Sequence, residues 1–443
     1  MKIEIHSSMR RAARAGMMAL FALVLSSALY AAEGSGTGSI IPSLDVTAGS
    51  LGTWTLRYTA ADTFVSGSIE ITIPAGWSAP QIANAAAAGY VTVSSEGALE
   101  AAPITIDGYG ITIHIAALDT GQTVDVVYGD QSIDAVGRAR AQIAAHTGVE
   151  FAVRSDPDGV GRAPLALSPS LDVVAAAIAR LTFATPSRTF AAGGESAVIR
   201  VRTEDEFGNP AAVSADQKID LVSSATSGSF SHLSGGSFAE TDSVTILTGE
   251  DTVSFYYRDT AAGAKTMTVS ADGQAWTTAQ QSVIVTPGTP FRLRAFPADT
   301  TATAGDYVRF RLRVEDAYGN PSPLPNDQTI TLSAEAGSFF STSNHTTPLA
   351  TVVIPTGADT VHLDYRHTIK RIFPPYLLAF YDLNGVLPTL EVASTTIAID
   401  NAPFDASKSE VFASNTTATA NGADSIQVTV YSRDSFWNGL DGS

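Results

Sequence analysis

A short motif that recurs along the chain constrains its fold more than any other feature. EDEFGNP at 204–210 returns as EDAYGNP at 315–321, and SRDSFWNG at 432–439 is a weaker third copy. Asp205, Asp316 and Asp434 are the corresponding acidic residues. Recurrence at a nearly fixed period marks repeated structural units and has to be recognised before any fold is assigned.

The segments that flank the motif repeat in the same order. DQKIDL at 216–221 corresponds to DQTITL at 327–332, and TGEDTVSFYYRDT at 248–260 to TGADTVHLDYRHT at 356–368. Several collinear matches exclude chance, and a Pro-Phe pair opens the later units at 290 and 403. We therefore predict repeat 1 over residues 178–289, repeat 2 over 290–402 and the truncated start of repeat 3 over 403–443. A full repeat has the length of one β-sandwich.

Alternation of apolar and polar residues in short runs indicates β-strands throughout. Isoleucines alternate at 69, 71 and 73 and again at 111, 113 and 115, and 308–314 alternates apolar residues with arginines. Such a pattern buries one face of a strand and leaves the other in water. We expect an all-β chain of tandem immunoglobulin-like β-sandwich domains, the last one incomplete, with residues 43–177 as a divergent N-terminal β-sandwich.

The N-terminus has the layout of a secretory signal peptide. Arg10, Arg11 and Arg14 precede an apolar run over 17–25, and small residues follow. The run is shorter than the ~20 residues that span a bilayer, which disfavours a membrane anchor. We predict a signal peptide over 1–31 and a Gly/Ser spacer over 32–42. The mature protein is then secreted or displayed on the cell surface, without membrane insertion.

Composition narrows the function classes. Hydrophobic residues make up 44% and charged residues 16% of the sequence, as in folded domains. A net charge of −18 repels phosphate backbones and anionic lipids, so we predict no nucleic-acid partner. The chain has no cysteine, which requires core stabilisation without disulfides and excludes thiol nucleophiles.

The repeated motif reads as a structural turn. Glycine tolerates positive φ, asparagine bonds to nearby backbone, and proline ends strand pairing, while the aromatic residue can anchor the chain to the core. A metal-binding role for the aspartates is the alternative. The predicted turn residues are Asp205, Gly208, Asn209, Pro210, Asp316, Gly319, Asn320 and Pro321.

ANGADSIQVTVYSRDSFWNG at 420–439, together with EDEFGNP and EDAYGNP, resembles the immunoglobulin-like repeat of invasin/intimin-type bacterial surface proteins. The resemblance covers about residues 179–443. It implies a rod-like extracellular stalk of stacked sandwiches, in which a terminal module often binds the ligand. Trp437 departs from the family pattern, because it replaces the usual glycine of the turn.

Motifs of known chemistry are missing from the sequence. It contains no G-x-S-x-G, no phosphate-binding loop and no H-E-x-x-H. We interpret His362 and His367 as surface residues on opposite faces of a strand. Asp156 and Asp158 read as a solvated turn rather than a calcium loop. We predict no catalytic residues, no metal site and no cofactor.

Two weaker hypotheses concern ligands. Acidic residues such as Asp400 and Asp405 near a domain edge suggest that calcium is a stabilising ion. The four tryptophans suggest a second hypothesis, in which an exposed ring stacks on a sugar, and Trp77 on a loop tip is the candidate. Isolated tryptophans, however, usually fill a sandwich core. The tryptophans are Trp54, Trp77, Trp276 and Trp437.

The first functional hypothesis is a non-catalytic exported stalk or adhesin-type module for surface display, with an extracellular protein or glycan as partner. The alternative is a non-catalytic spacer, or a glycan-binding front part, of a large secreted hydrolase. Residues 403–443 provide too few strands for a sandwich of their own. We expect that segment to be disordered or attached to its neighbour, and the chain to be a fragment of a longer protein.

Overall fold

The computed structural model describes residues 34–134, 136–238, 242–382, 393–420 and 422–440. These residues form strands and no helix, which confirms the all-β prediction. The predicted signal peptide lies outside the described residues. Within the part of the chain that is described, no helix has the length and apolarity needed to cross a membrane.

The first sandwich is built on a four-stranded sheet in the order β1-β4-β9-β6 and a five-stranded sheet in the order β13-β12-β5-β8-β7. Its main strands are β1 (Thr37–Ile41), β4 (Trp54–Thr59), β5 (Phe64–Thr72), β6 (Val91–Ser95), β7 (Ala98–Asp107), β8 (Gly110–Leu118), β9 (Thr123–Tyr128), β12 (Ala152–Asp156) and β13 (Ala163–Pro164). Two small sheets complete it, from β2 (Val46–Thr47), β3 (Leu51–Gly52), β10 (Ala139–Arg140), β11 (His146–Glu150) and β14 (Ser170–Val174).

The second sandwich pairs a four-stranded sheet, β15-β17-β21-β19, with a five-stranded sheet, β16-β23-β22-β18-β20. The strands are β15 (Ile178–Phe183), β16 (Thr189–Ala191), β17 (Ile199–Asp205), β18 (Gln217–Ser223), β19 (Ser229–Ser231), β20 (Ser243–Ile246), β21 (Thr252–Arg258), β22 (Gly263–Ala271) and β23 (Ala279–Thr286).

The third sandwich repeats this plan with the sheets β24-β26-β31-β28-β29 and β25-β33-β32-β27-β30. The strands are β24 (Arg292–Phe296), β25 (Asp299–Thr303), β26 (Tyr307–Glu315), β27 (Gln328–Ala334), β28 (Ser338–Ser341), β29 (Asn344–Leu349), β30 (Thr351–Ile354), β31 (Thr360–Arg366), β32 (Arg371–Asp382) and β33 (Ala393–Asp400). A terminal ribbon of β34 (Glu410–Ala413) and β35 (Val428–Tyr431) follows.

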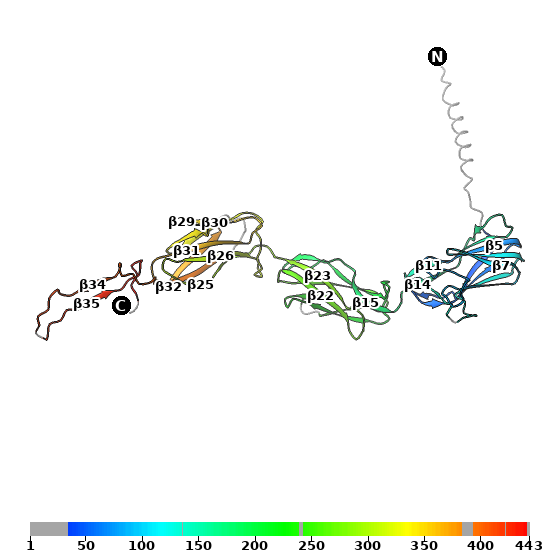
Figure 1. Cartoon of the computed structure of the whole chain (residues 1–443), viewed down its shortest axis with the longest axis horizontal. Helices are drawn as coiled ribbons and strands as arrows, with labels where there is room; N and C mark the ends of the chain where they lie inside the picture. Colours follow the sequence, from blue (N-terminus) through cyan, green and yellow to red (C-terminus); the bar gives the residue numbers. More distant parts are fainter. Residues whose placement is uncertain (1–33, 135, 239–241, 383–392, 421, 441–443) are drawn as a thin grey trace, which may run out of the picture.

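Each sandwich has its own hydrophobic core, and the three sandwiches lie in file along the long axis of the molecule (Figure 1). The predicted alternations account for much of these cores. The two isoleucine triplets at 69–73 and 111–115 are almost fully buried, and so are Phe310, Leu312 and Val314 of β26. Independent cores of this kind give a chain of units that contact only their neighbours.

The predicted spacer over 32–42 is wrong in part. Residues Thr37–Ile41 form strand β1, which pairs antiparallel with all of β4 except its first residue. Ile40 is buried in the first core, and the Tyr58 hydroxyl donates to the carbonyl of Ser35 at 2.6 Å. The segment is rich in Gly and Ser, and this composition led to the spacer prediction. The apolar residues at 40 and 41 favour a strand instead.

The tryptophans of the first sandwich lie inside it. Trp54 and Trp77 are only 3% and 2% exposed, and their rings meet edge to face at 4.9 Å between centroids. The hypothesis that Trp77 lies exposed on a loop tip is therefore wrong. Its ring also contacts Phe151 edge on, so it fills the core, as single tryptophans of sandwiches usually do.

Candidate functional site at the joints between sandwiches

The Asp205 carboxylate organises the turn that follows strand β17. Its Oδ1 accepts hydrogen bonds from the backbone N–H groups of Phe207 and Asn209, at 2.9 and 2.8 Å. Its Oδ2 accepts from the side-chain amide of Asn209 at 2.7 Å. Gly208 stands between them with φ +92°, a conformation that glycine adopts without steric cost.

The same carboxylate also holds the linker between two sandwiches. Oδ2 of Asp205 accepts from the backbone N–H of Ala176 at 2.9 Å, just after the last strand of the first sandwich. The exposed fraction of Asp205 is 0%. One buried side chain therefore fixes both its own turn and the connection to the preceding sandwich.

Asn209 reaches across the joint. Its amide Nδ2 donates to the carbonyl of Ile143 at 2.7 Å, and its Oδ1 accepts from the N–H of Ala145 at 2.8 Å. Both partners belong to a loop of the first sandwich. A side-chain amide presents one donor group and one acceptor, which here match a carbonyl and an N–H two residues apart.

The second joint repeats the first in detail. Asp316 Oδ2 accepts from the linker N–H of Gly288 at 2.8 Å, as Asp205 does from Ala176. Asn320 donates to the carbonyl of Thr260 and accepts from the N–H of Ala262, both at 2.8 Å. The turn glycine, Gly319, has φ +91°.

The third joint attaches the terminal segment to the third sandwich. Asp434 accepts from the N–H of Ala402 at 2.9 Å. Asn438 donates to the carbonyl of Thr368 and accepts from the N–H of Lys370, both at 2.8 Å. Trp437 takes the place of the turn glycine with φ +71°, although that region disfavours a side chain.

An aromatic residue packs against a glycine of the preceding sandwich in each joint. A Cβ placed on Gly49 would lie 2.6 Å from the Phe207 ring, and the corresponding pairs are Tyr318 with Gly193 and Phe436 with Gly305. Phe207 and Phe436 also pack against the core of the sandwich before them. The expectation that this aromatic anchors its own core is therefore corrected, since it docks on the neighbour.

Hydrogen bonds keep the joint aspartates ionised. Burial alone would raise the pKa of Asp205, but donation from the Asn209 side chain and from three backbone N–H groups outweighs it. The pKa of Asp205 consequently lies below its ordinary value, and the pKa values of Asp316 and Asp434 are lowered in the same way.

Four donors already surround each of these carboxylates, which favours the turn interpretation over the metal alternative. In the part of the chain that the structure covers, no cluster of three or more His, Asp or Glu residues is arranged to hold a metal ion. Pro210 and Pro321, the last residues of the predicted motif, pair back with Glu204 and Glu315 and close the turns.

The other candidate residues take part in local contacts. Asp405 Oδ1 accepts from the N–H and the hydroxyl of Ser407, and Asp400 accepts from the next N–H in the chain. His362 is exposed, whereas His367 is buried edge on to Tyr376, and burial lowers its pKa. The surface interpretation is therefore wrong for His367.

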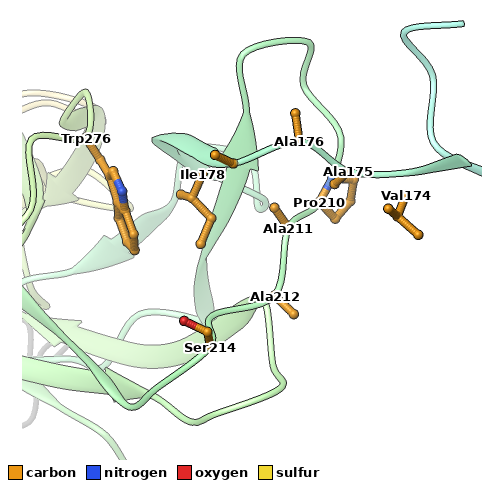
Figure 2. Close-up of a pocket in the computed structure, with 10 residues that line it drawn as sticks. Val174, Ala175, Ala176, Ile178, Pro210, Ala211, Ala212, Ser214 and Trp276 are labelled. Atoms are coloured by element: carbon orange, nitrogen blue, oxygen red, sulfur yellow. The ribbon is translucent and has the colours of Figure 1, made fainter. Parts of the chain in front are cut away.

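A groove of about 540 Å³ opens beside the first joint. Figure 2 shows Val174 and Trp276 at its two ends, with Pro210 and Ala211 between them. Alanines make up much of the lining, and Ser214 supplies its one side-chain hydroxyl. The groove offers few groups that could orient a polar ligand.

No model of a protein family and no curated protein sequence matches this chain. Solved structures do match it. FdeC, an adhesin of Escherichia coli, is 16% identical over 83% of this chain and 98% of its own, with a TM-score of 0.33. Invasin, a bacterial integrin-binding protein, is 14% identical over 90% of this chain and 76% of its own, also with a TM-score of 0.33. The D0–D1 domains of intimin are 12% identical over 50% of this chain and 98% of their own, with a TM-score of 0.18.

Proposed function

We propose that this chain is a non-catalytic stalk or adhesin-type module, exported and displayed at a bacterial cell surface. The observation that carries the proposal is the joint that recurs at Asp205, Asp316 and Asp434 with nearly identical contacts. A repeated motif that fixes each sandwich on the next suits a stalk, which holds a binding module away from the cell surface.

Two separate connections cross each joint, and this supports a stiff rod. The covalent linker is held by the aspartate, while the asparagine and the aromatic bind a loop and a glycine at another place on the neighbour. A single linker would leave a joint free to bend, which is the default for domains in series. Attachment at two places opposes both bending and twisting.

The predicted boundaries near residues 178, 290 and 403 belong to this proposal. The pinned linker N–H groups at Ala176, Gly288 and Ala402 lie next to each boundary and support it. We also propose surface display and binding of an extracellular protein or glycan. The resemblance of the repeated motif to invasin/intimin-type repeats supports both.

Small-angle scattering on the mature chain tests the stalk. We expect an elongated particle with a narrow distribution of shapes for the wild type, and a broader one for the double variant Asn209→Ala/Asn320→Ala. Asn344→Ala is the matched control, because the Asn344 side chain accepts its hydrogen bonds from Thr346 of the same strand, β29, and lies away from the joints. A wild type as flexible as the double variant would overturn the proposal.

A further inference from the structure

The outer surface of the third sandwich carries a concentration of arginines. At the outward positions of β24, β26 and β31 stand six arginines and only two carboxylates, Glu315 and Asp364. These six are a large share of the 26 lysines and arginines in a chain of net charge −18. We call them the basic face: Arg292, Arg294, Arg309, Arg311, Arg313 and Arg366.

The strand register brings like charges together on the basic face. Arg294 lies directly opposite Arg313, and Arg311 lies opposite Phe296. The guanidinium carbons of Arg294, Arg311 and Arg313 are 5.6, 4.7 and 4.8 Å from the centroid of the Phe296 ring. Like charges placed opposite one another on a sheet are destabilising, so the fold alone does not account for this arrangement.

The carboxylates leave much of this charge unbalanced. Glu315 pairs with Arg292 at 3.0 Å and with Arg313, and lies 3.9 Å from Arg294. Arg309 is balanced by Asp364 at 3.0 Å. Arg311 forms no ion pair with any described carboxylate, and its buried Nε has no hydrogen-bond partner among the described residues.

The second sandwich shows which part of the cluster is structural. There Arg180 and Arg202 flank Glu204 as Arg292 and Arg313 flank Glu315. Thr182, which pairs with Arg202, occupies the position of Arg294 and donates to Glu204. The ion-pair triad is thus common to both repeats, whereas Arg294 is an addition that the triad does not need.

We propose that the basic face binds a linear acidic polysaccharide through its carboxylate or sulfate groups. Outward residues along one strand recur about every 7 Å, so the arginines at alternate positions of β26 place guanidinium groups at a regular spacing for successive acid groups of an extended chain. The inference adds a class of ligand to the proposed function. It rests on the proposed function only for the extracellular location, where such a polymer occurs.

A thin polymer fits better than the other acidic partners. A second copy of this chain, or another acidic protein, would bring a broad negative surface against the rest of the rod and be repelled. Single-stranded nucleic acid is usually held by exposed aromatic rings as well as by charge. On the basic face the Phe296 ring is covered by guanidinium groups.

Binding of the mature chain to immobilised polygalacturonate, heparin and neutral dextran tests the proposal, with an oligothymidylate as the nucleic-acid arm. We expect binding to one or both acidic polysaccharides, weakening as salt rises, and none to dextran. Arg294→Thr/Arg311→Gln should reduce the affinity at least about tenfold, since charge-assisted hydrogen bonds are lost. Arg294→Lys/Arg311→Lys, which keeps the charge but not the fork, should lose less.

The charge-matched control is Lys218→Gln/Lys265→Gln on the second sandwich, which removes two positive charges and should leave the affinity unchanged. An equal loss in this control would mean that only net charge matters, and would overturn the site. Absence of wild-type binding, or a preference for the oligothymidylate, would overturn it as well. None of these results would alter the scattering from the rod, so failure here is distinct from failure of the stalk.

Discussion

The side-chain amide of Asn320 donates a hydrogen bond to the backbone carbonyl of Thr260, which lies in the preceding sandwich, and accepts one from the N–H of Ala262. The amide also donates to Asp316, so a single residue ties its own turn to the neighbouring loop. The joint therefore depends on an amide that can donate and accept at once.

Asn320→Asp should loosen the second joint with little change of shape. The new carboxylate cannot donate to Thr260, and it places a second negative charge beside Asp316. We expect a loss of about 2–4 kcal/mol at the joint, from the missing bonds and the repulsion. Faster protease cleavage at residues 286–290 reports it. Asn344→Asp serves as control, and equal cleavage in both variants would contradict the role of Asn320.

Gly193→Ala should disturb the same joint from the other side. Its Cβ would lie 2.0 Å from the Tyr318 hydroxyl, and φ is +76°. Gly249→Ala provides the control, because its φ is +86° but no atom lies within 4 Å of the new Cβ. Both variants carry the backbone strain of about 1 kcal/mol. Only Gly193→Ala should broaden the scattering profile, and identical profiles would show that the contact with Tyr318 is unimportant.

Acid should weaken the joints through their aspartates. The folded pKa of Asp316 is depressed, so its contribution is complete above the unfolded pKa of about 3.9 and is lost as pH falls through the lower folded value. Asp316→Asn should lose about 1–3 kcal/mol at pH 7, and this deficit should shrink below pH 4. Urea unfolding at several pH values measures it. The exposed Asp306→Asn is the control, and a deficit independent of pH would contradict the assignment.

Trp77→Ala should destabilise the first sandwich but not the third. The ring is buried between Trp54 and Phe151, and removal of a buried aromatic costs about 3–5 kcal/mol. Because the cores are separate and the third sandwich shares no joint with the first, the unfolding transition of the third sandwich should not move. Trp437→Ala, at a side chain that is 51% exposed, should cost far less. Differential scanning calorimetry distinguishes these outcomes.

The sequence predicts the strands well, because alternation is a property of each segment by itself. Ile69, Ile71 and Ile73 are buried as their spacing predicts. The use of Asn209 and Phe207 across the joint could not be predicted from the turn motif, since turn chemistry accounts for both residues without a neighbour. A second signal was available. An Ala-Gly pair stands at 48–49, 192–193 and 304–305, and its glycine receives the aromatic of the next unit.

The general tendency of isolated tryptophans to fill a sandwich core favours a buried Trp77, and the structure agrees. The local sequence, a tryptophan after a strand and a glycine, is also compatible with a loop tip. Only the tertiary contact with Trp54 distinguishes the two. The position of Arg294 on the basic face could not be predicted from the sequence either. The alternation at 308–314 does not show which arginines of neighbouring strands share a carboxylate.

The terminal segment should exchange its amide hydrogens at two different rates. The sequence predicts a segment that is disordered or attached to its neighbour, and the described residues divide between a docked turn and an exposed ribbon. The N–H groups of Phe436 and Asn438 donate to the buried Asp434 carboxylate, whereas every residue of β35 is exposed and pairs only with β34.

An isolated two-stranded ribbon is marginal in water. We therefore expect amides of β35 to exchange at least about tenfold faster than those of Phe436 and Asn438. Asn438→Ala should release the turn and speed exchange at both places, while Val430→Ala should affect the ribbon alone. Exchange at β35 as slow as at Phe310 and Leu312 would show that the ribbon is stable without a packing layer. The order of the terminal segment would then not depend on the docked turn.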